Sequence, residues 1–261
     1  MAEVRKEDTD LNHISHLISK DVGLSAAVLK TANSQFYGLR HKAKSIHGAL
    51  VALGLGCTAN LIAGLMLRRV FASINHPAME QYWDSTSKIG LTAAFLGREL
   101  GVTDINKAHT FAMFRDSGTP LLMCKFPDYC KTVNVAETED GQHVTDAEKA
   151  RYGVDHASVG ANLAMSWYLP EDIWQAIQMH HAHEDLAGSE KAARDVTAKL
   201  VALGTLADCM FRTYRKIGSH RHLECDEEVA FAILGVERHE LEPLQPDIDR
   251  LLRSEIGRAH V

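Results

Sequence analysis

Helical spacing of apolar residues along almost the whole chain is the feature that most restricts its fold. Ile14, Leu17 and Ile18 share one helix face, and residues 82–100 carry apolar side chains at helical spacing over a longer stretch. No run alternates apolar and polar residues with period two, and no Asn-Gly hairpin turn occurs. The sequence therefore predicts an all-α fold.

Several helix boundaries follow from local signals. Ser25 is placed to cap one helix, and the pair Thr145 and Glu148 has the spacing of a capping box at the start of another. Residues 134–144 are polar, and residues 215–226 are rich in charge. We expect the first of these segments to be a loop and the second to be a connection between helices.

The segment 45–67 contains no Asp, Glu, Lys or Arg and is long enough to cross a membrane. It also contains Asn60, and Gly54 and Gly56 interrupt its middle. Two buried helices, the first capped by Ser45, account for this pattern better than a membrane span does. We therefore expect no membrane span.

Composition points to an ordinary globular protein. The 261 residues are 46% hydrophobic and 24% charged, and the net charge of −6 argues against direct nucleic-acid binding. The polar first ten residues show no signal peptide. The five cysteines lack metal-site spacing, which indicates reduced thiols in a cytoplasmic protein: Cys57, Cys124, Cys130, Cys209 and Cys225.

Two blocks of sequence, Asn-Ser-Gln-Phe-Tyr-Gly near the start and Trp-Tyr-Leu-Pro followed by His-His later, carry a family likeness. Together they resemble the HDOD family, the non-catalytic relatives of HD-type and HD-GYP metal-dependent phosphohydrolases. The positions that match the family's structural motifs are Asn33, Ser34, Phe36, Tyr37, Gly38, Gly54, Trp83, Gly160, Trp167 and Pro170.

This resemblance implies an HD-like multi-helix globule with an N-terminal helical subregion. The HDOD domain would cover residues 10–215, with the subregion ending near residue 75 and a degenerate HD core over 78–215. Residues 216–253 would then be a C-terminal helical extension. The last residues, 254–261, resemble a translated sequencing adapter, and we expect them to be a non-native tail.

The resemblance also implies a metal site that has lost its function. The vestigial positions would be Ser85, Arg115, Asp116, His156, His180 and Asp208. Arginine cannot act as a metal ligand, and Arg115 replaces the histidine of the expected His-Asp pair. Each residue also has a purely structural interpretation: histidines suit a helix C-terminus, and Asp116 suits a turn.

Counting the donors that remain predicts no closed cage, no stoichiometric metal, no cofactor and no phosphodiester hydrolysis. The resemblance then implies a signalling module that acts through protein contacts, in cyclic di-GMP, motility or gene-regulation pathways of a bacterium. Its partners and oligomeric state are left open. Two alternatives stay open as well: a residual HD-type phosphohydrolase, and a nucleotide or phosphate sensor that binds its ligand through Arg115 and His181.

Overall fold

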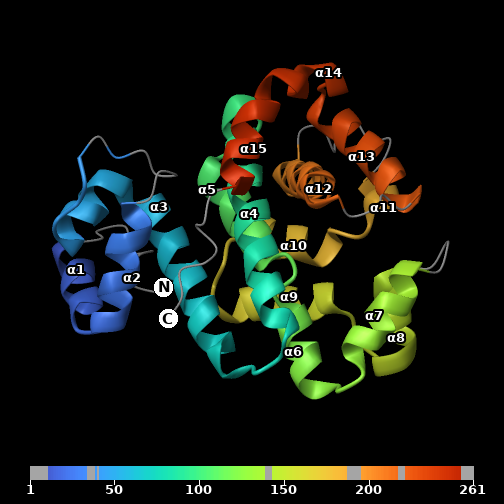
Figure 1. Cartoon of the computed structure of the whole chain (residues 1–261), viewed down its shortest axis with the longest axis horizontal. Coiled ribbons are helices and arrows are strands. Elements are labelled where there is room, and N and C mark those ends of the chain that lie inside the picture. Colours follow the sequence, from blue (N-terminus) through green and yellow to red (C-terminus); the bar gives the residue numbers. More distant parts are fainter. Residues whose placement is uncertain are drawn as a thin grey trace. The chain divides into compact units, whose positions relative to one another are not determined.

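The computed structural model describes residues 11–33, 39, 41–138, 143–186, 195–216 and 221–253. Every regular element within these ranges is a helix, so the all-α prediction is confirmed. The chain separates into two compact units, Met1–Asn75 and His76–Val261 (Figure 1).

The first unit is a small helical cluster. It contains α1 (Leu11–Ser19), α2 (Val22–Ala32), α3 (Ile46–Val70) and the 3-10 turn η3 (Phe71–Ser73). The helices α1, α2 and α3 pack against one another. Their shared apolar core consists of Ile14, Ile18, Val28, Ile46, Leu50, Leu61 and Ile62.

Helix α3 is two helices that meet at Gly54. This glycine has φ 74° and ψ 171°, a conformation that breaks the helix and that side chains of L-residues rarely adopt. Ser45 caps the first piece by accepting a hydrogen bond from the backbone N–H of Gly48, as the sequence predicts. Helix α3 is only partly buried, because its residues Val51 and Leu55 are exposed.

Length and apolarity mark Ile46–Ser73 as a candidate membrane span. The break at Gly54 leaves the longer piece with an axial length of about 24 Å, short of the roughly 30 Å of a hydrocarbon core. This break supports the expectation of packed helices, and the absence of a span stays a prediction.

The second unit holds the remaining helices. They are α4 (Ala78–Glu99), α5 (Ile105–Phe114), α6 (Gly118–Lys125), α7 (Tyr129–Thr138), α8 (Val144–Tyr152), α9 (His156–Ser166), α10 (Glu171–Met179), α11 (His183–Leu186), α12 (Val196–Arg215), α13 (Arg221–Leu234), α14 (Arg238–Leu241), η5 (Glu242–Leu244) and α15 (Gln245–Arg253).

Helices α4, α5, α10 and α12 pack together at the centre of this unit. Phe111 and Phe114 of α5 and Leu203 of α12 are fully buried there. Gly204 of α12 lies against Phe111, where an added Cβ would sit 2.6 Å from a ring carbon. The close approach of α5 and α12 therefore depends on a glycine at this position. Helices α13 and α15 pack on α12 inside the same unit.

Some predicted boundaries are wrong. Residues 134–138 belong to α7 and are not loop, and residues 221–226 belong to α13 and are not a connection. Ser25 lies inside α2, whose first turn is capped by Asp21 through the N–H of Leu24. The hydroxyl of Ser25 instead bonds the carbonyl of Ile18.

The family-motif residues that the structure describes have structural contacts. The amide side chain of Asn33 makes two hydrogen bonds to the backbone of Ala43, and Trp167 packs edge-on against Phe114. Pro170 precedes α10 as its N-cap residue. Ser34, Phe36, Tyr37, Gly38 and residues 254–261 lie outside the described residues.

Candidate functional site

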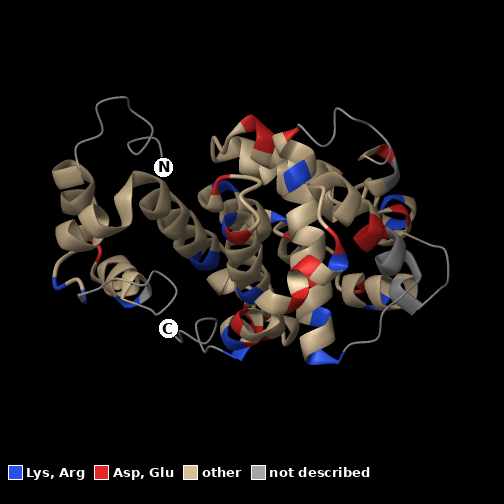
Figure 2. Cartoon of the chain, turned by 90° about the horizontal axis from the view of Figure 1, so that it is seen from above, with Lys and Arg blue, Asp and Glu red and all other residues tan. Residues whose placement is uncertain are grey.

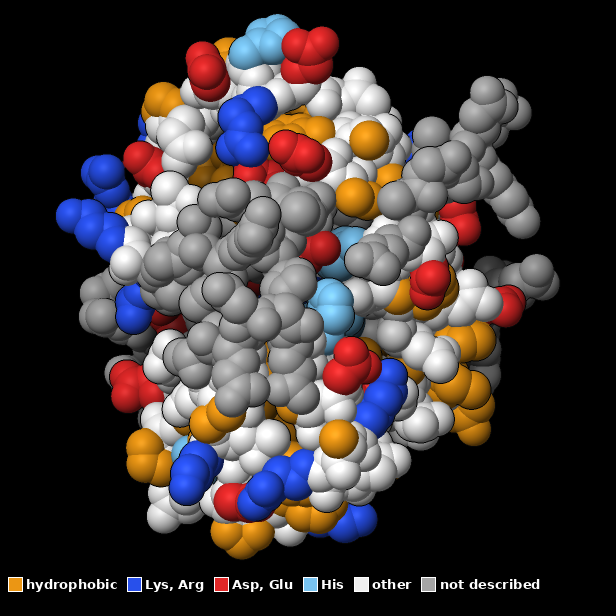
Figure 3. Space-filling model, turned by 90° about the vertical axis from the view of Figure 1, so that its right-hand side faces the viewer, with side chains coloured by type: hydrophobic (Ala, Val, Ile, Leu, Met, Phe, Trp, Pro, Cys, Tyr) orange, Lys and Arg blue, Asp and Glu red, His pale blue; other side chains and the backbone are white. Residues whose placement is uncertain are grey.

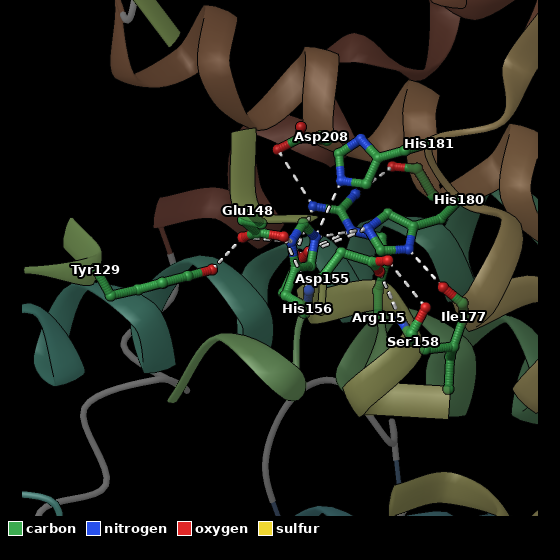
Figure 4. Close-up of polar contacts among 12 residues, drawn as sticks. Arg115, Tyr129, Glu148, Asp155, His156, Ser158, Ile177, His180, His181 and Asp208 are labelled. Carbon is green, nitrogen blue, oxygen red and sulfur yellow. Dashed lines mark hydrogen bonds and ion pairs between the residues drawn. The ribbon is translucent and has the colours of Figure 1, made fainter. Parts of the chain in front are cut away.

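Three helix ends of the second unit bring polar side chains to one place (Figure 4). Arg115 and Asp116 follow α5, His156 opens α9, and His180 and His181 follow α10. Asp155 caps α9 by accepting hydrogen bonds from the backbone N–H and the hydroxyl of Ser158, which fixes the first turn that carries His156.

The three imidazoles converge through their Nε2 atoms. The Nε2 of His156 lies 3.0 Å from the Nε2 of His181 and 3.3 Å from the Nε2 of His180. The Oδ1 of Asp116 lies 3.4 Å from the Nε2 of His180 and 3.8 Å from the Nε2 of His156. The three ring nitrogens therefore lie close together, and the Asp116 oxygen lies beside two of them.

Glu148 is a member of the site that the sequence did not identify. Its fully buried carboxylate accepts hydrogen bonds from the backbone N–H of His156 (2.8 Å), from the Nδ1 of the same residue (2.8 and 2.9 Å) and from the Tyr129 hydroxyl. The predicted capping box is thus wrong: α8 starts at Val144 without a side-chain cap, and Glu148 points inward. No spacing rule connects positions 148 and 156, because the turn after α8 brings them together.

Arg115 forms the opposite side of the site. Its guanidinium donates to the Oδ2 of Asp116 at 2.8 and 3.0 Å and to the carbonyl of Gly204 at 3.3 Å. It also lies 3.8 Å from a carboxylate oxygen of Asp208 on α12. The side chain is 12% exposed, so these contacts occupy most of its donors in a nearly dry environment.

These contacts shift the pKa values of the site in opposite directions. Burial alone would raise the pKa of Asp116, but the Arg115 guanidinium and His180 hold it well below its usual range. Burial alone would lower the pKa of His156, but the Glu148 carboxylate raises it. Burial lowers the pKa of His180 and, together with the charges of the other two histidines, that of His181.

The structure brings some of the predicted site residues together and leaves Ser85 apart from them. Asp116, His156 and His180 meet directly, and Asp208 joins them through Arg115. The Ser85 hydroxyl bonds the backbone carbonyls of Gln81 and Tyr82 within its own helix, α4. Tyr82 of the same helix is buried, and burial and the charge of Asp116 raise its pKa.

The surroundings of the site are mixed in charge. Histidine side chains reach the surface in the middle of the face in Figure 3, with acidic side chains beside them. Figure 2 shows Lys and Arg interspersed with Asp and Glu on the helices of the second unit. This distribution is consistent with the expectation of no direct nucleic-acid contact, which stays a prediction.

A family model for the HDOD domain matches residues 1–183, well over half of the chain. The chain belongs to the HDOD family. This HDOD protein is 28% identical over 181 residues to an uncharacterized protein of Treponema pallidum (strain Nichols), a match that covers 68% of this chain and 35% of the relative. The chain thus spans about a third of the length of that curated relative.

Solved structures show the same fold. An HDOD domain protein of unknown function from Geobacter sulfurreducens has a TM-score of 0.71 at 22% identity, over 98% of this chain and 89% of its own. A suspected phosphohydrolase from Shewanella amazonensis SB2B has a TM-score of 0.73 at 22% identity, over 98% of this chain and 90% of its own. A suspected signal transduction protein from Marinobacter aquaeolei VT8 has a TM-score of 0.67 at 21% identity, over 98% of this chain and 55% of its own.

The HD-type fold raises the question of a metal ion, and the donors can be tested against one. Four ligands around a tetrahedral zinc ion, at 2.0–2.1 Å from it, stand roughly 3.3 Å apart. The Nε2 of His156 lies 3.0 and 3.3 Å from the other two Nε2 atoms, which is near that value, and the Asp116 Oδ1 lies 3.4 and 3.8 Å from the Nε2 atoms of His180 and His156. The residues present fit one ion, and the ligand count made from the sequence lacked His181.

Proposed function

We propose that this HDOD protein is a non-catalytic signalling module that acts through contacts with other proteins in a bacterial regulatory pathway. The observation that carries the proposal is the Arg115 guanidinium, which lies between the carboxylates of Asp116 and Asp208. Hydrolysis by a two-metal site needs a second cation close to such carboxylates, to activate water and stabilise the leaving oxygen. A fixed guanidinium charge supplies neither a ligand position nor a bound water there.

Two alternatives have less support. A residual phosphohydrolase would need a catalytic water on an open metal position, and Arg115 occupies the side of the site where a second ion would bind such a water. A phosphate sensor would need free donors on Arg115. Asp116, Gly204 and Asp208 already engage that guanidinium.

A hydrolysis assay tests the non-catalytic part of the proposal. The purified full chain and its Asp116→Ala variant are incubated with manganese or iron(II) and either bis-para-nitrophenyl phosphate or cyclic di-GMP. We expect no turnover above the buffer and no difference between the two proteins. Turnover by the wild-type chain that disappears in Asp116→Ala would overturn the proposal.

A capture experiment tests the protein-contact part. The tagged chain is isolated from its native cells, and any candidate partner is purified and titrated against the chain alone. We expect a saturable one-to-one or two-to-one complex. Cyclic di-GMP binding in the absence of any reconstituted protein complex would favour the sensor alternative instead.

A further inference from the structure

We propose that the groove between α7 and α8 is the docking site for an amphipathic helix of a partner protein, with an acidic residue beside its apolar stripe. The proposal rests on the signalling role proposed above and names the surface and the kind of segment that meet. The groove has a volume of about 360 Å³, and only these two helices and Asp128, just before α7, line it.

Helices α7 and α8 form an antiparallel hairpin that is held together at one end (Figure 1). The hydroxyl of Tyr152, the last residue of α8, lies 2.7 Å from that of Thr132 and donates to Asp128 at 3.2 Å. The Tyr152 ring stacks on Phe126, and the Arg151 guanidinium donates to the Asp128 carboxylate at 2.8 Å. Because the end of α8 meets the start of α7, the groove runs along both helices.

The floor of the groove is apolar and is built mostly from small side chains. Helix α7 contributes Val135 and Ala136, and α8 contributes Ala147 and Ala150. Val135 is 44% exposed, and Ala150 is exposed as well. Alanine methyl groups leave space between two helices, so a third helix can approach closely and insert larger apolar side chains. Such a helix would remove this apolar surface from water.

The length of the groove suits a short helix. Its lining positions on the α7 side are 128, 131, 132, 135 and 136, which lie on one helix face. Eight residues separate the first from the last, which corresponds to about 12 Å of helix axis. Two turns of a visiting helix cover that length with apolar side chains at positions i, i+3 or i+4, and i+7. A groove open to solvent lacks the enclosure of a small-molecule site.

The charges of the lining residues define the chemistry of the visiting helix. The three charged ones, Asp128, Lys131 and Arg151, come from the start of α7 and the end of α8. Asp128 and Arg151 form an ion pair with each other. Lys131 is exposed, and within the described ranges no carboxylate pairs with it. This end of the groove therefore has one positive charge in excess, although the whole chain has a net charge of −6, and an acidic residue complements it.

The opposite faces of the same two helices are anchored in the candidate site. Tyr129 of α7 and Glu148 of α8 are buried and hydrogen-bonded to each other, and the Glu148 carboxylate also bonds the Nδ1 of His156. The hairpin is thus fixed on its inner side while its outer side carries the groove. A preformed surface of this kind loses little conformational freedom when a partner binds.

The first step of the test compares the tagged full chain with Ala150→Glu and Ala232→Glu in isolating partners from native cells. Ala150→Glu places a carboxylate in the apolar floor. Ala232 of α13 is the matched control, because it too is an exposed alanine two residues before the end of its helix. We expect a protein that the wild-type chain and Ala232→Glu retain and that Ala150→Glu binds on the order of 30-fold more weakly. Far-ultraviolet circular dichroism checks that each variant is folded.

The second step defines the occupant. The segment of that protein that cross-links to the groove is made as a synthetic peptide and titrated against the purified full chain. We expect the peptide to become helical on binding, and Lys131→Glu to weaken binding by about 2–5-fold. Replacing the acidic residue of the peptide by lysine should restore binding to Lys131→Glu.

The outcomes separate this proposal from the proposed function. Equal retention of every partner by Ala150→Glu and Ala232→Glu would overturn the groove as a docking site and leave the protein-contact role standing. A peptide that binds in an extended form, or a dimer of the chain itself that Ala150→Glu dissociates, would overturn the partner helix as occupant. A wild-type chain that forms no saturable protein complex would overturn the proposed function and this proposal together.

Discussion

The two halves of the site differ in the charged groups that they contain. The imidazole half (Glu148, His156, His180 and His181) gathers three imidazoles beside one buried carboxylate. The guanidinium half (Arg115, Asp116 and Asp208) is an ion pair network with a permanent cation. One half has ring nitrogens close together, and the other holds a guanidinium between two carboxylates. The same set of helix ends thus supports two different kinds of polar contact.

The largest loss of folding stability is expected at Gly118, which lies against the backbone of His156. An added Cβ there would lie 2.0 Å from the carbonyl oxygen of His156 and 2.9 Å from the backbone N of Gly160. Gly118→Ala should therefore lower the free energy of unfolding by more than about 3 kcal/mol, because backbone must move against backbone. Gly160→Ala is the control, since its nearest contacts are 3.1 and 3.2 Å and the loss should be smaller. Urea unfolding measures both, and equal losses would contradict the tight approach at Gly118.

The next largest effect concerns the guanidinium half. Arg115→Met removes the guanidinium beside Asp116 and one of the two arginine partners of Asp208, so two partly buried carboxylates lose a compensating charge. We expect a loss of about 2–3 kcal/mol in unfolding free energy. Arg212→Met should cost less, because Asp208 keeps Arg115. If both variants unfold at the same denaturant concentration, Arg115 is not the centre of this network.

Acid should destabilise the segment that follows the imidazole half, at His183. Burial and the charges of His180 and Arg115 lower the pKa of His183 to about 4, below the roughly 6.5 of an unfolded histidine. Folding therefore favours the neutral ring, and this stabilisation is present above pH 6.5 and lost as pH falls toward 4. In metal-free buffer the wild-type chain should lose about 1–2 kcal/mol more than His183→Gln between pH 7 and pH 5. Parallel pH profiles of the two proteins would exclude this contribution.

The smallest effect is expected at Ser85, which the family likeness assigned to the site. Its hydroxyl bonds only backbone carbonyls of α4. Ser85→Ala should change the unfolding free energy by less than about 0.5 kcal/mol in urea unfolding. A loss larger than that would show that the Ser85 hydroxyl stabilises more than the local turn of α4.

The sequence by itself determined the helical class, the break at Gly54 and the HDOD family. These features depend on apolar spacing and on residues that are neighbours in the chain, such as Ser45 and Gly48 or Asp155 and Ser158. It also identified most of the site residues, because Asp116, His156 and His180 stand in recognisable motifs.

Only the tertiary structure decided which way Glu148 and His181 point. Local spacing made Glu148 a capping residue, but burying its carboxylate beside His156 and Tyr129 satisfies more donors than a helix cap does. The third imidazole reaches the centre because the chain turns after α10, and no pattern in the sequence encodes that direction. The number of donors around a common centre is a property of helix packing, so the ligand count had to come from the fold.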